Sequence, residues 1–397
     1  MPWTPSSLMS ERLEFVRAVL HRRAGQSIRD ICRSTGITEK TGHKWLTRYG
    51  AGGPAALADR SHAPHQPAHQ VPPALVAPIL ALRDDHPTWG ARKLRDVLRR
   101  EQPTRPWPAA STITTLLKRA GLVPPRRRTH RERAAWAHPA RLTRAHAPND
   151  VWAADFKGEF RLASGPYCYP LTLTDLHSRY VLAVHGLAST ASGPAQAQCQ
   201  RCFEQHGLPR VIRTDNGVPF GVPSALGGLS PLAVWWIRLG IRPERIARGA
   251  PQQNGAHERM HKTLKAETTR PPSATLAAQQ HRFDRWRRTF NDRRPHEALA
   301  GTPPATHYAL SPRPFPRRLP MLDYAPDLDL RRVSGRGEIT WRSTRLFLST
   351  VLAGEYVSLT ETATDEWTIA FGPLNLGVYS TALLQFVEAL AWTRQTT

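Results

Sequence analysis

Apolar residues recur every three or four positions along the first fifty residues, a spacing typical of helices. The pattern predicts one helix over 11–23 and a second over 27–35. Thr38 can cap a third helix that runs to about residue 49, after a turn at Gly36. A helix, a glycine-containing turn and a capped helix form the helix-turn-helix arrangement, whose second helix enters the major groove of DNA.

Polar side chains on the predicted third helix are the candidates for contact with DNA. They are Lys40, Thr41, His43, Lys44 and Arg48. The alternative is a three-helix bundle that binds no DNA and leaves these side chains in solvent.

A second helical unit is predicted after a stretch rich in Gly, Pro, His and Ala. Its helices cover 74–83, 91–101 and 111–120, and Ser111 would cap the last one. This unit again has the helix-turn-helix pattern. Its candidate DNA contacts are Thr112, Thr115, Lys118 and Arg119.

A basic run follows this unit and includes Arg126, Arg127 and Arg128. A charge run is usually a solvated segment. Next to two predicted DNA-binding units, contact with DNA phosphates is the better interpretation.

From Val151 onwards, apolar runs broken by turns predict strands. Strands over 151–157, 167–174 and 179–186 would form an antiparallel meander. The elements predicted next are a helix over 195–206, a buried strand over 211–214, a helix near 232–239, a strand near 241–246, and helices over 253–268 and 274–291. This mixed order indicates a central sheet with helices packed on it.

Polar and apolar residues alternate after the Pro-rich segment 303–326. The alternation predicts strands over 338–349, 355–361, 366–371 and 375–379. Short strands at this density are typical of a small barrel.

The charge balance indicates the kind of partner. The 397 residues include 55 Lys and Arg against 31 Asp and Glu, a formal net charge of +24. Such an excess favours a polyanion, because neutralised phosphates release condensed counterions. Codon bias towards Arg and Pro is the alternative explanation. We expect double-stranded DNA as the partner.

Cysteine usage and hydropathy argue against other classes of protein. Cys199 and Cys202 have no second pair that would complete a zinc site, and four cysteines in this length make no disulfide framework. No apolar run approaches the roughly 20 residues that span a bilayer. Ser6, Ser10 and Glu11 interrupt any signal-like segment. We therefore expect a cytoplasmic protein with no membrane partner.

Three carboxylates stand in positions that suit metal-dependent chemistry. Asp155 lies on the first predicted strand, Asp215 follows the short buried strand, and Glu258 lies near the start of a long helix. Hard Mg²⁺ prefers carboxylate oxygens. Two ions about 4 Å apart can clamp the attacking and leaving oxygens of a displacement at phosphorus. Carboxylates from adjacent strands and a facing helix would converge on one point.

The sequence around these carboxylates resembles a known family. The phrases are Asp-Asn-Gly at 215–217 and Gln-x-Asn-Gly-x-x-Glu at 252–258, after the strand that carries Asp155. In combination they resemble the integrase-type core of DDE transposases, the bacterial insertion-sequence enzymes that share this core with retroviral integrases. The resemblance runs from about residue 11 to 305. The 43 positions from Asp215 to Glu258 exceed the usual retroviral interval, and the surplus falls in the Gly/Pro/Ser-rich segment Gly221–Ser230.

The resemblance implies an RNase H-like fold and a dependence on two Mg²⁺ or Mn²⁺ ions. On position, Asp155, Asp215 and Glu258 match the catalytic and metal-binding residues of the family. The implied activity is 3′-end cleavage of a mobile element and its transfer to target DNA. The implied partners are the terminal inverted repeats, the target DNA and further copies of the chain, in a bacterial cytoplasm at the nucleoid.

Polar residues beside the triad are further candidates for contact with DNA. Lys262 and Lys265 share the helix face of Glu258, although they could serve only as its ion-pair partners. The other candidates are Asn216, Gln252 and Asn254.

Two other carboxylates are weaker candidates. Asp175 opens a turn between strands, where Asp is ordinarily structural. Glu267 is nine residues beyond Glu258, half a turn away from its helix face.

The fold class predicted for the whole chain is multidomain, with all-α helix-turn-helix units, an α/β RNase H-like core and a small all-β barrel. The expected order is a helix-turn-helix domain at 1–50, a linker at 51–73, a second helix-turn-helix domain at 74–123, a basic linker at 124–150, an integrase core at 151–302, a Pro-rich linker at 303–326 and a DNA-binding barrel at 327–397.

Two other functions use part of the same evidence. A DNA-binding regulator would keep the helix-turn-helix units and a degenerate core, although all three carboxylates are present. A nuclease without joining activity would use the same metal site, but it would not need two helix-turn-helix units and a C-terminal barrel.

Overall fold

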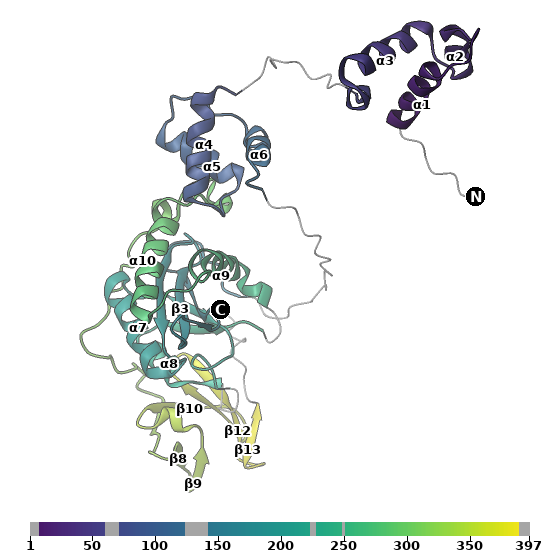
Figure 1. Ribbon diagram of the computed structural model, residues 1–397. Coiled ribbons are helices and arrows are strands. Elements are labelled where there is room, and N and C mark those ends of the chain that lie inside the picture. Colours follow the sequence, from purple (N-terminus) through teal and green to yellow (C-terminus); the bar gives the residue numbers. More distant parts are fainter. Residues whose placement is uncertain (1–7, 60–70, 124–141, 223–227, 248–250, 389–397) are drawn as a thin grey trace. The chain divides into compact units, whose positions relative to one another are not determined.

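The computed structural model describes residues 8–59, 71–123, 142–222, 228–247 and 251–388. The chain divides into two compact units, Met1–Pro72 and Pro73–Thr397. Figure 1 shows their helices and strands. Among the helices that the structure describes, none combines the length and the apolar character needed to span a bilayer.

The first unit is the predicted helix-turn-helix bundle. It contains α1 (Leu8–Leu20), α2 (Ile28–Ser34), α3 (Glu39–Gly52) and a short 3-10 helix, Pro54–Leu57. Ser27 and Asp30 form a reciprocal capping box at α2, and the Thr38 side chain accepts from the Thr41 amide at the start of α3. The buried core includes Phe15, Val16, Ile31, Trp45 and Leu57.

The second unit begins with three further helices. They are α4 (Pro73–Asp85), α5 (Ala91–Glu101) and α6 (Ala110–Arg119), packed around a core that includes Ile79, Trp89, Leu94 and Ile113. The prediction that Ser111 caps the last helix is wrong. Backbone after Pro108 is extended only as far as Ala109, so the helix begins one residue earlier and Ser111 lies within its first turn.

A six-stranded mixed sheet forms the centre of the second unit. Its strands are β1 (Val151–Phe156), β2 (Phe160–Arg161), β3 (Tyr167–Asp175), β4 (Val181–Leu187), β5 (Val211–Thr214) and β6 (Arg242–Arg245). The predicted meander is confirmed, since β3 pairs antiparallel with both β1 and β4. On the other side of β1 the pairing is parallel, first with β5 and then between β5 and β6.

Helices cover both faces of this sheet. On one face, α7 (Ser192–His206) and α8 (Pro231–Arg238) bury Phe203 and Trp236 against Trp152 and Leu173. The same core holds Cys199 and Cys202, and burial raises the pKa of Cys199 to about 12. On the other face, Met260 and Leu264 of α9 (Gly255–Thr268) join Phe283 and Trp286 of α10 (Leu276–Asp292). This arrangement confirms the predicted RNase H-like α/β core.

The segment after α10 packs closely on this core. Tyr308 stacks on Tyr180 with ring centroids 4.2 Å apart. The Arg313 guanidinium donates to the carbonyl oxygens of Pro209, Leu239 and Gly240.

The C-terminal region is all-β, as predicted. Its elements are β7 (Asp329–Arg332), β8 (Glu338–Trp341), β9 (Thr344–Phe347), β10 (Tyr356–Ala363), β11 (Glu366–Phe371), β12 (Leu374–Ser380) and β13 (Gln385–Glu388). Five of the described strands form an open antiparallel sheet with β13 and β7 at its edges, and β8 pairs with β9 in a separate hairpin. The barrel is therefore not closed by strand pairing. Ala233, Val234 and Ile237 of α8 pack into the apolar core of this region.

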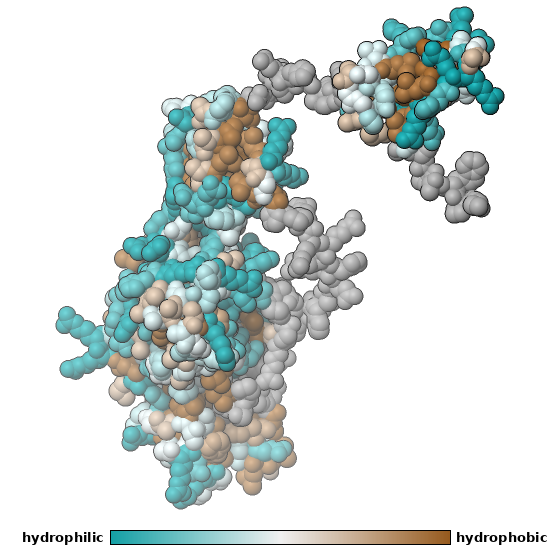
Figure 2. All heavy atoms as spheres, in the orientation of Figure 1, coloured by the Kyte–Doolittle hydropathy of each residue, from teal (hydrophilic) through white to brown (hydrophobic). Residues whose placement is uncertain are grey.

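Figure 2 shows that hydrophilic residues cover most of the visible face of the α/β core. Apolar residues gather within the bundle of α1–α3 and within the bundle of α4–α6.

Candidate active site

Asp155 and Asp215 are brought to one edge of the sheet by strand register. In the parallel pair β1–β5, Ala153 is the partner of Arg213. Asp155 and Asp215 each lie two residues further along, at the carboxyl ends of these neighbouring strands. Two carboxylates therefore lie at the same level on adjacent strands.

Asp155 has an environment that disfavours its charge. Burial raises its pKa to about 7, and the neighbouring charge of Asp215 acts in the same direction. Glu258 adds a smaller effect of the same sign, whereas Lys157 opposes it. Asp155 therefore interacts with both other members of the predicted triad.

Asp215 lies in a turn that directly follows β5. The amide of Gly217 donates to Asp215 Oδ1 at 3.1 Å. Asn216, which the sequence suggested as a DNA contact, donates from Nδ2 to the carbonyl oxygen of Ile246 at 2.8 Å. These bonds hold the turn that carries the carboxylate.

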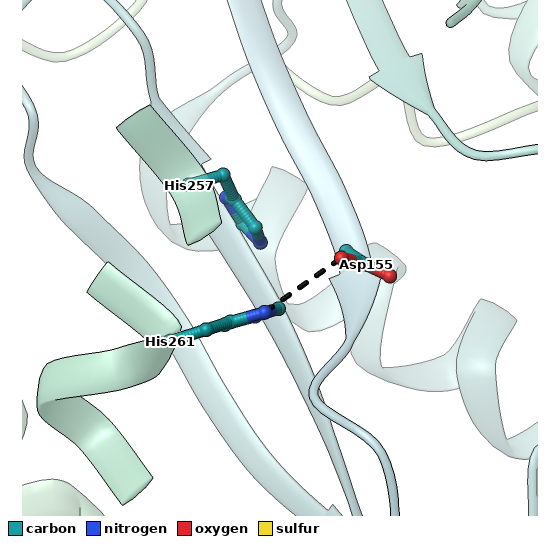
Figure 3. A group of neighbouring side chains, drawn as sticks. All are labelled: Asp155, His257 and His261. Atoms are coloured by element: carbon teal, nitrogen blue, oxygen red, sulfur yellow. Dashed lines mark ion pairs between the residues drawn. The ribbon is translucent and has the colours of Figure 1, made fainter. Parts of the chain in front are cut away.

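Helix α9 presents different chemistry on two sides. Glu258, Lys262 and Lys265 are exposed. His257 and His261, one turn apart, are buried towards the sheet. Figure 3 shows both imidazoles beside Asp155, with His261 Nδ1 3.7 Å from Asp155 Oδ2.

Two threonines of β3 contact the buried imidazoles. Thr172 Oγ1 lies 2.9 Å from His257 Nε2 and 2.6 Å from His261 Nε2. Thr174 Oγ1 lies 2.6 Å from His257 Nδ1. Burial lowers the pKa of His257 to about 3 and also lowers that of His261, so both rings are neutral.

The sequence analysis did not identify these two histidines. Their spacing of four residues on a helix was a usable signal. Their contacts with Thr172 and Thr174 and their position beside Asp155 distinguish them from ordinary core histidines.

The two weaker carboxylate candidates have structural partners. Asp175 is fully buried and accepts from the amides of Asn149 and Ser178 and from the Ser178 hydroxyl. Glu267 accepts from Trp286 Nε1 at 2.7 Å and pairs with Arg294 at 2.8 Å.

The candidate DNA contacts of α3 differ in exposure. Lys40, His43 and Lys44 are exposed, and Thr41 and Arg48 are half-buried. Thr41 Oγ1 is 2.9 Å from the capping hydroxyl of Thr38. Lys44 and Arg48 lie over the Trp45 ring, at 4.8 and 5.0 Å from its centroid.

The remaining candidate DNA contacts are placed as follows. On α6, Thr115, Lys118 and Arg119 are exposed and Thr112 is half-buried. Asn254 is buried, and its Oδ1 has no hydrogen-bond partner among the described residues. Arg126, Arg127, Arg128 and the side chain of Gln252 lie outside the described residues.

Two adjoining cavities beside α9 carry cations, of which the sequence analysis identified only Lys262. One has a volume of about 750 Å³ and the other about 480 Å³. Both are lined by Arg179 and Arg259. Burial and then the charge of Arg259 lower the pKa of Arg179. We call the two cavities together the α9 groove. Its other cations are Lys93, Lys262 and Arg294 in the larger cavity and Arg144 and Arg213 in the smaller one.

Family models match both the helical units and the core. A helix-turn-helix domain matches residues 11–65 and a homeodomain-like domain matches 41–117. Integrase core domains match residues 145–251 and 239–304. The integrase matches contain all three candidate carboxylates.

Insertion-element proteins are among the relatives. An uncharacterized 39.2 kDa protein of insertion element IS476 from Xanthomonas euvesicatoria is 31% identical over 236 residues, which are 58% of this chain and 64% of that protein. A 31.7 kDa protein of IS407 from Burkholderia multivorans is 27% identical over 229 residues, covering 57% of this chain and 77% of that protein. A solved HTLV-2 integrase catalytic core in complex with magnesium covers 42% of this chain and all of its own, with 16% identity and a TM-score of 0.32.

The fold and the domain matches define a helix-turn-helix protein with an integrase core. The resemblance to insertion-sequence DDE transposases with a retroviral-integrase-type core is confirmed.

The donor set at the site suits a divalent cation. Asp155, Asp215 and Glu258 offer hard carboxylate oxygens, and burial, followed by repulsion from the charges of Asp215 and Glu258, raises the pKa of Asp155. A bound cation would relieve this repulsion. A ligand set made only of carboxylates favours Mg²⁺ or Mn²⁺ over softer ions.

Proposed function

We propose that the chain is a DNA transposase that cuts the 3′ ends of a mobile element and joins them to target DNA. The observation that carries this proposal is the parallel register of β1 and β5, which places Asp155 and Asp215 at one edge of the sheet. The charge of Glu258 on α9 contributes to the raised pKa of Asp155. The integrase-core and helix-turn-helix matches support the same proposal.

In this proposal, Asp155, Asp215 and Glu258 hold two Mg²⁺ or Mn²⁺ ions. When bound, such ions stabilise the attacking and leaving oxygens of a displacement at phosphorus. Lys262 and Lys265 are exposed on the same helix and would contact phosphates beside the cleaved bond.

Recognition of the terminal inverted repeats is assigned to the helical units. The exposed side chains Lys40, His43 and Lys44 on α3 would read one segment of the repeat. Residues Thr115, Lys118 and Arg119 on α6 would contact another. The basic segment that includes Arg126, Arg127 and Arg128 would follow the phosphate backbone, and the C-terminal sheet would add further DNA contacts.

Joining two element ends to one target needs two active sites, and each chain has one Asp155, Asp215 and Glu258 set. The proposed active form is therefore a homo-oligomer, a dimer or larger, assembled on DNA. It would act in the bacterial cytoplasm, at the nucleoid.

The test uses the full-length chain, DNA fragments that carry the element's ends and a target plasmid. We expect paired-end complexes, and with Mg²⁺ or Mn²⁺ also 3′ nicking and joined product, whereas EDTA should abolish the nicked and joined products. Specific binding without nicking would favour a DNA-binding regulator. Nicked DNA without joined product would favour a nuclease.

A further inference from the structure

His261 lies beside the proposed metal site but is not one of the three carboxylates proposed to bind metal. Its side chain is 6% exposed and that of Asp155 is 23% exposed. One ligand atom from each of Asp155, His257 and His261 lies within 4.8 Å of the others. Which of the two imidazoles has a free nitrogen follows from the hydrogen bonds around Thr172 and Thr174.

The Thr172 hydroxyl determines where the imidazole protons lie. Thr172 Oγ1 donates its one proton to the carbonyl oxygen of Asp155 at 2.9 Å. It must therefore accept from both neighbouring Nε2 atoms, at 2.9 Å from His257 and 2.6 Å from His261. Each neutral ring then carries its proton on Nε2 and a lone pair on Nδ1.

The two Nδ1 lone pairs have different surroundings. Nδ1 of His257 accepts from the Thr174 hydroxyl at 2.6 Å, so both nitrogens of this ring are used. Nδ1 of His261 faces Asp155 Oδ2 at 3.7 Å. This separation is too long for a hydrogen bond, and two acceptors face each other across it.

A cation fits between these two acceptors. Two ligand atoms that are each about 2.1 Å from one ion lie at most about 4.2 Å apart, and the 3.7 Å separation is inside that limit. We infer that Nδ1 of His261 is a nitrogen ligand of the ion that Asp155 binds. This inference rests on the proposed function. His257 is a positioning residue, because it fixes the threonine hydroxyl that orients the His261 ring.

A nitrogen ligand changes which ion the site prefers. Imidazole suits transition-metal ions, whereas Mg²⁺ is better served by carboxylates and water. The site should therefore favour Mn²⁺ over Mg²⁺ more strongly than a site made of three carboxylates alone.

The test is pulsed electron paramagnetic resonance of Mn²⁺ bound to the full-length protein without DNA. We expect ¹⁴N modulation from a coordinated imidazole in the wild-type chain, and its replacement by ¹⁵N modulation after labelling with [¹⁵N]histidine. The labelling experiment needs no variant. His261→Asn should lose the modulation and weaken Mn²⁺ binding about tenfold, with a change of less than about threefold for Mg²⁺. The control is His281→Asn, which removes an exposed imidazole on α10 and should keep the modulation.

The outcomes separate this inference from the proposed function. If Mn²⁺ binding depends on Asp155 but the wild-type chain shows no ¹⁴N modulation, the His261 inference fails and the carboxylate site stands. Modulation that persists in His261→Asn also overturns the inference. If Mn²⁺ binds equally well to Asp155→Asn, both the inference and the proposed metal site fail.

Discussion

Asp155 and Asp215 each lie two residues beyond a pair of parallel strand partners, Ala153 and Arg213. The carboxylates are 60 positions apart in the sequence and are brought together by this one pairing. The pairing depends on the apolar runs of β1 and β5, which are buried on both sides. The site is therefore a consequence of how the central sheet forms.

The raised pKa of Asp155 predicts a pH-dependent effect of metal on stability. Its folded-state pKa of about 7 lies above the ordinary value of 3.8. A carboxylate of this kind favours the folded state fully below its unfolded pKa, and this contribution is lost as the pH rises through about 7. Because a divalent ion binds the ionised carboxylate, stabilisation by Mg²⁺ should increase over the same range.

Thermal unfolding of wild type and Asp155→Asn, in EDTA and in Mg²⁺, measures this effect. The Mg²⁺-induced rise in Tm should be larger at about pH 8 than at about pH 6 in the wild type, and small at both in the variant. The variant keeps all other titrating groups, so the difference between the two proteins isolates the contribution of Asp155. An equal Mg²⁺ effect at both pH values would show that Mg²⁺ and protons do not compete for the carboxylate of Asp155.

Substitutions on α3 should reduce sequence preference. His43→Ala and Lys44→Ala each remove an exposed side chain, and a specific base contact contributes about 1–3 kcal/mol of discrimination. Competition binding between an element end and a scrambled duplex measures the preference. The control is Arg17→Ala, which removes an exposed cation on α1 and should weaken binding to both duplexes equally. An unchanged preference in both α3 variants would exclude α3 as the recognition helix.

The α9 groove should bind DNA phosphates. Arg179→Gln and Arg259→Gln each remove a cation that lines both cavities. Each should lower DNA affinity without changing sequence preference, and should reduce the slope of log affinity against log salt by about 1. Arg285→Gln, an exposed residue of α10, is the matched control. If the slopes of log affinity against log salt for both variants equal that of the control, the α9 groove does not contact DNA.

Glu267 should matter for stability. It accepts from Trp286, pairs with the buried Arg294 and so joins α9 to α10. Glu267→Ala leaves a buried guanidinium without this partner and should cost about 3 kcal/mol. Glu204→Ala removes an exposed carboxylate of α7 and should change the free energy of unfolding by less than about 0.5 kcal/mol. Denaturant unfolding followed by tryptophan fluorescence compares the two, and equal values would contradict this role.

Regular elements with strong local signals were predictable from the sequence. β5 and α5 have the predicted bounds, and Thr38 caps α3 as expected. The run predicted as one strand over 338–349 is two strands, because Arg342 and Ser343 adopt left-handed backbone and form a tight turn. The pattern also missed β7 and β13, which lie at the edges of their sheet and need little apolar alternation.

The sequence indicated the carboxylates of the candidate site but did not identify its imidazoles. The sequence phrases around Asp215 and Glu258 indicated the triad, and helical periodicity made Glu267 a weaker candidate. The role of His261 depends on where the single proton of Thr172 lies, a detail of tertiary contact between β3 and α9. Most cations of the α9 groove come from segments far apart in the sequence, so the local pattern around Glu258 identified only Lys262 among them.

Strand transfer by Asp155→Asn and Asp215→Asn tests the central claim most directly. Both changes remove a ligand charge and leave α3 and α6 untouched. A labelled element end, a target plasmid and Mg²⁺ should therefore give joined product with the wild-type chain only. Both variants should bind the end with an affinity within about threefold of wild type, because the recognition helices supply the base contacts. Joined product at the wild-type level from either variant would contradict the assignment of that carboxylate to the reaction.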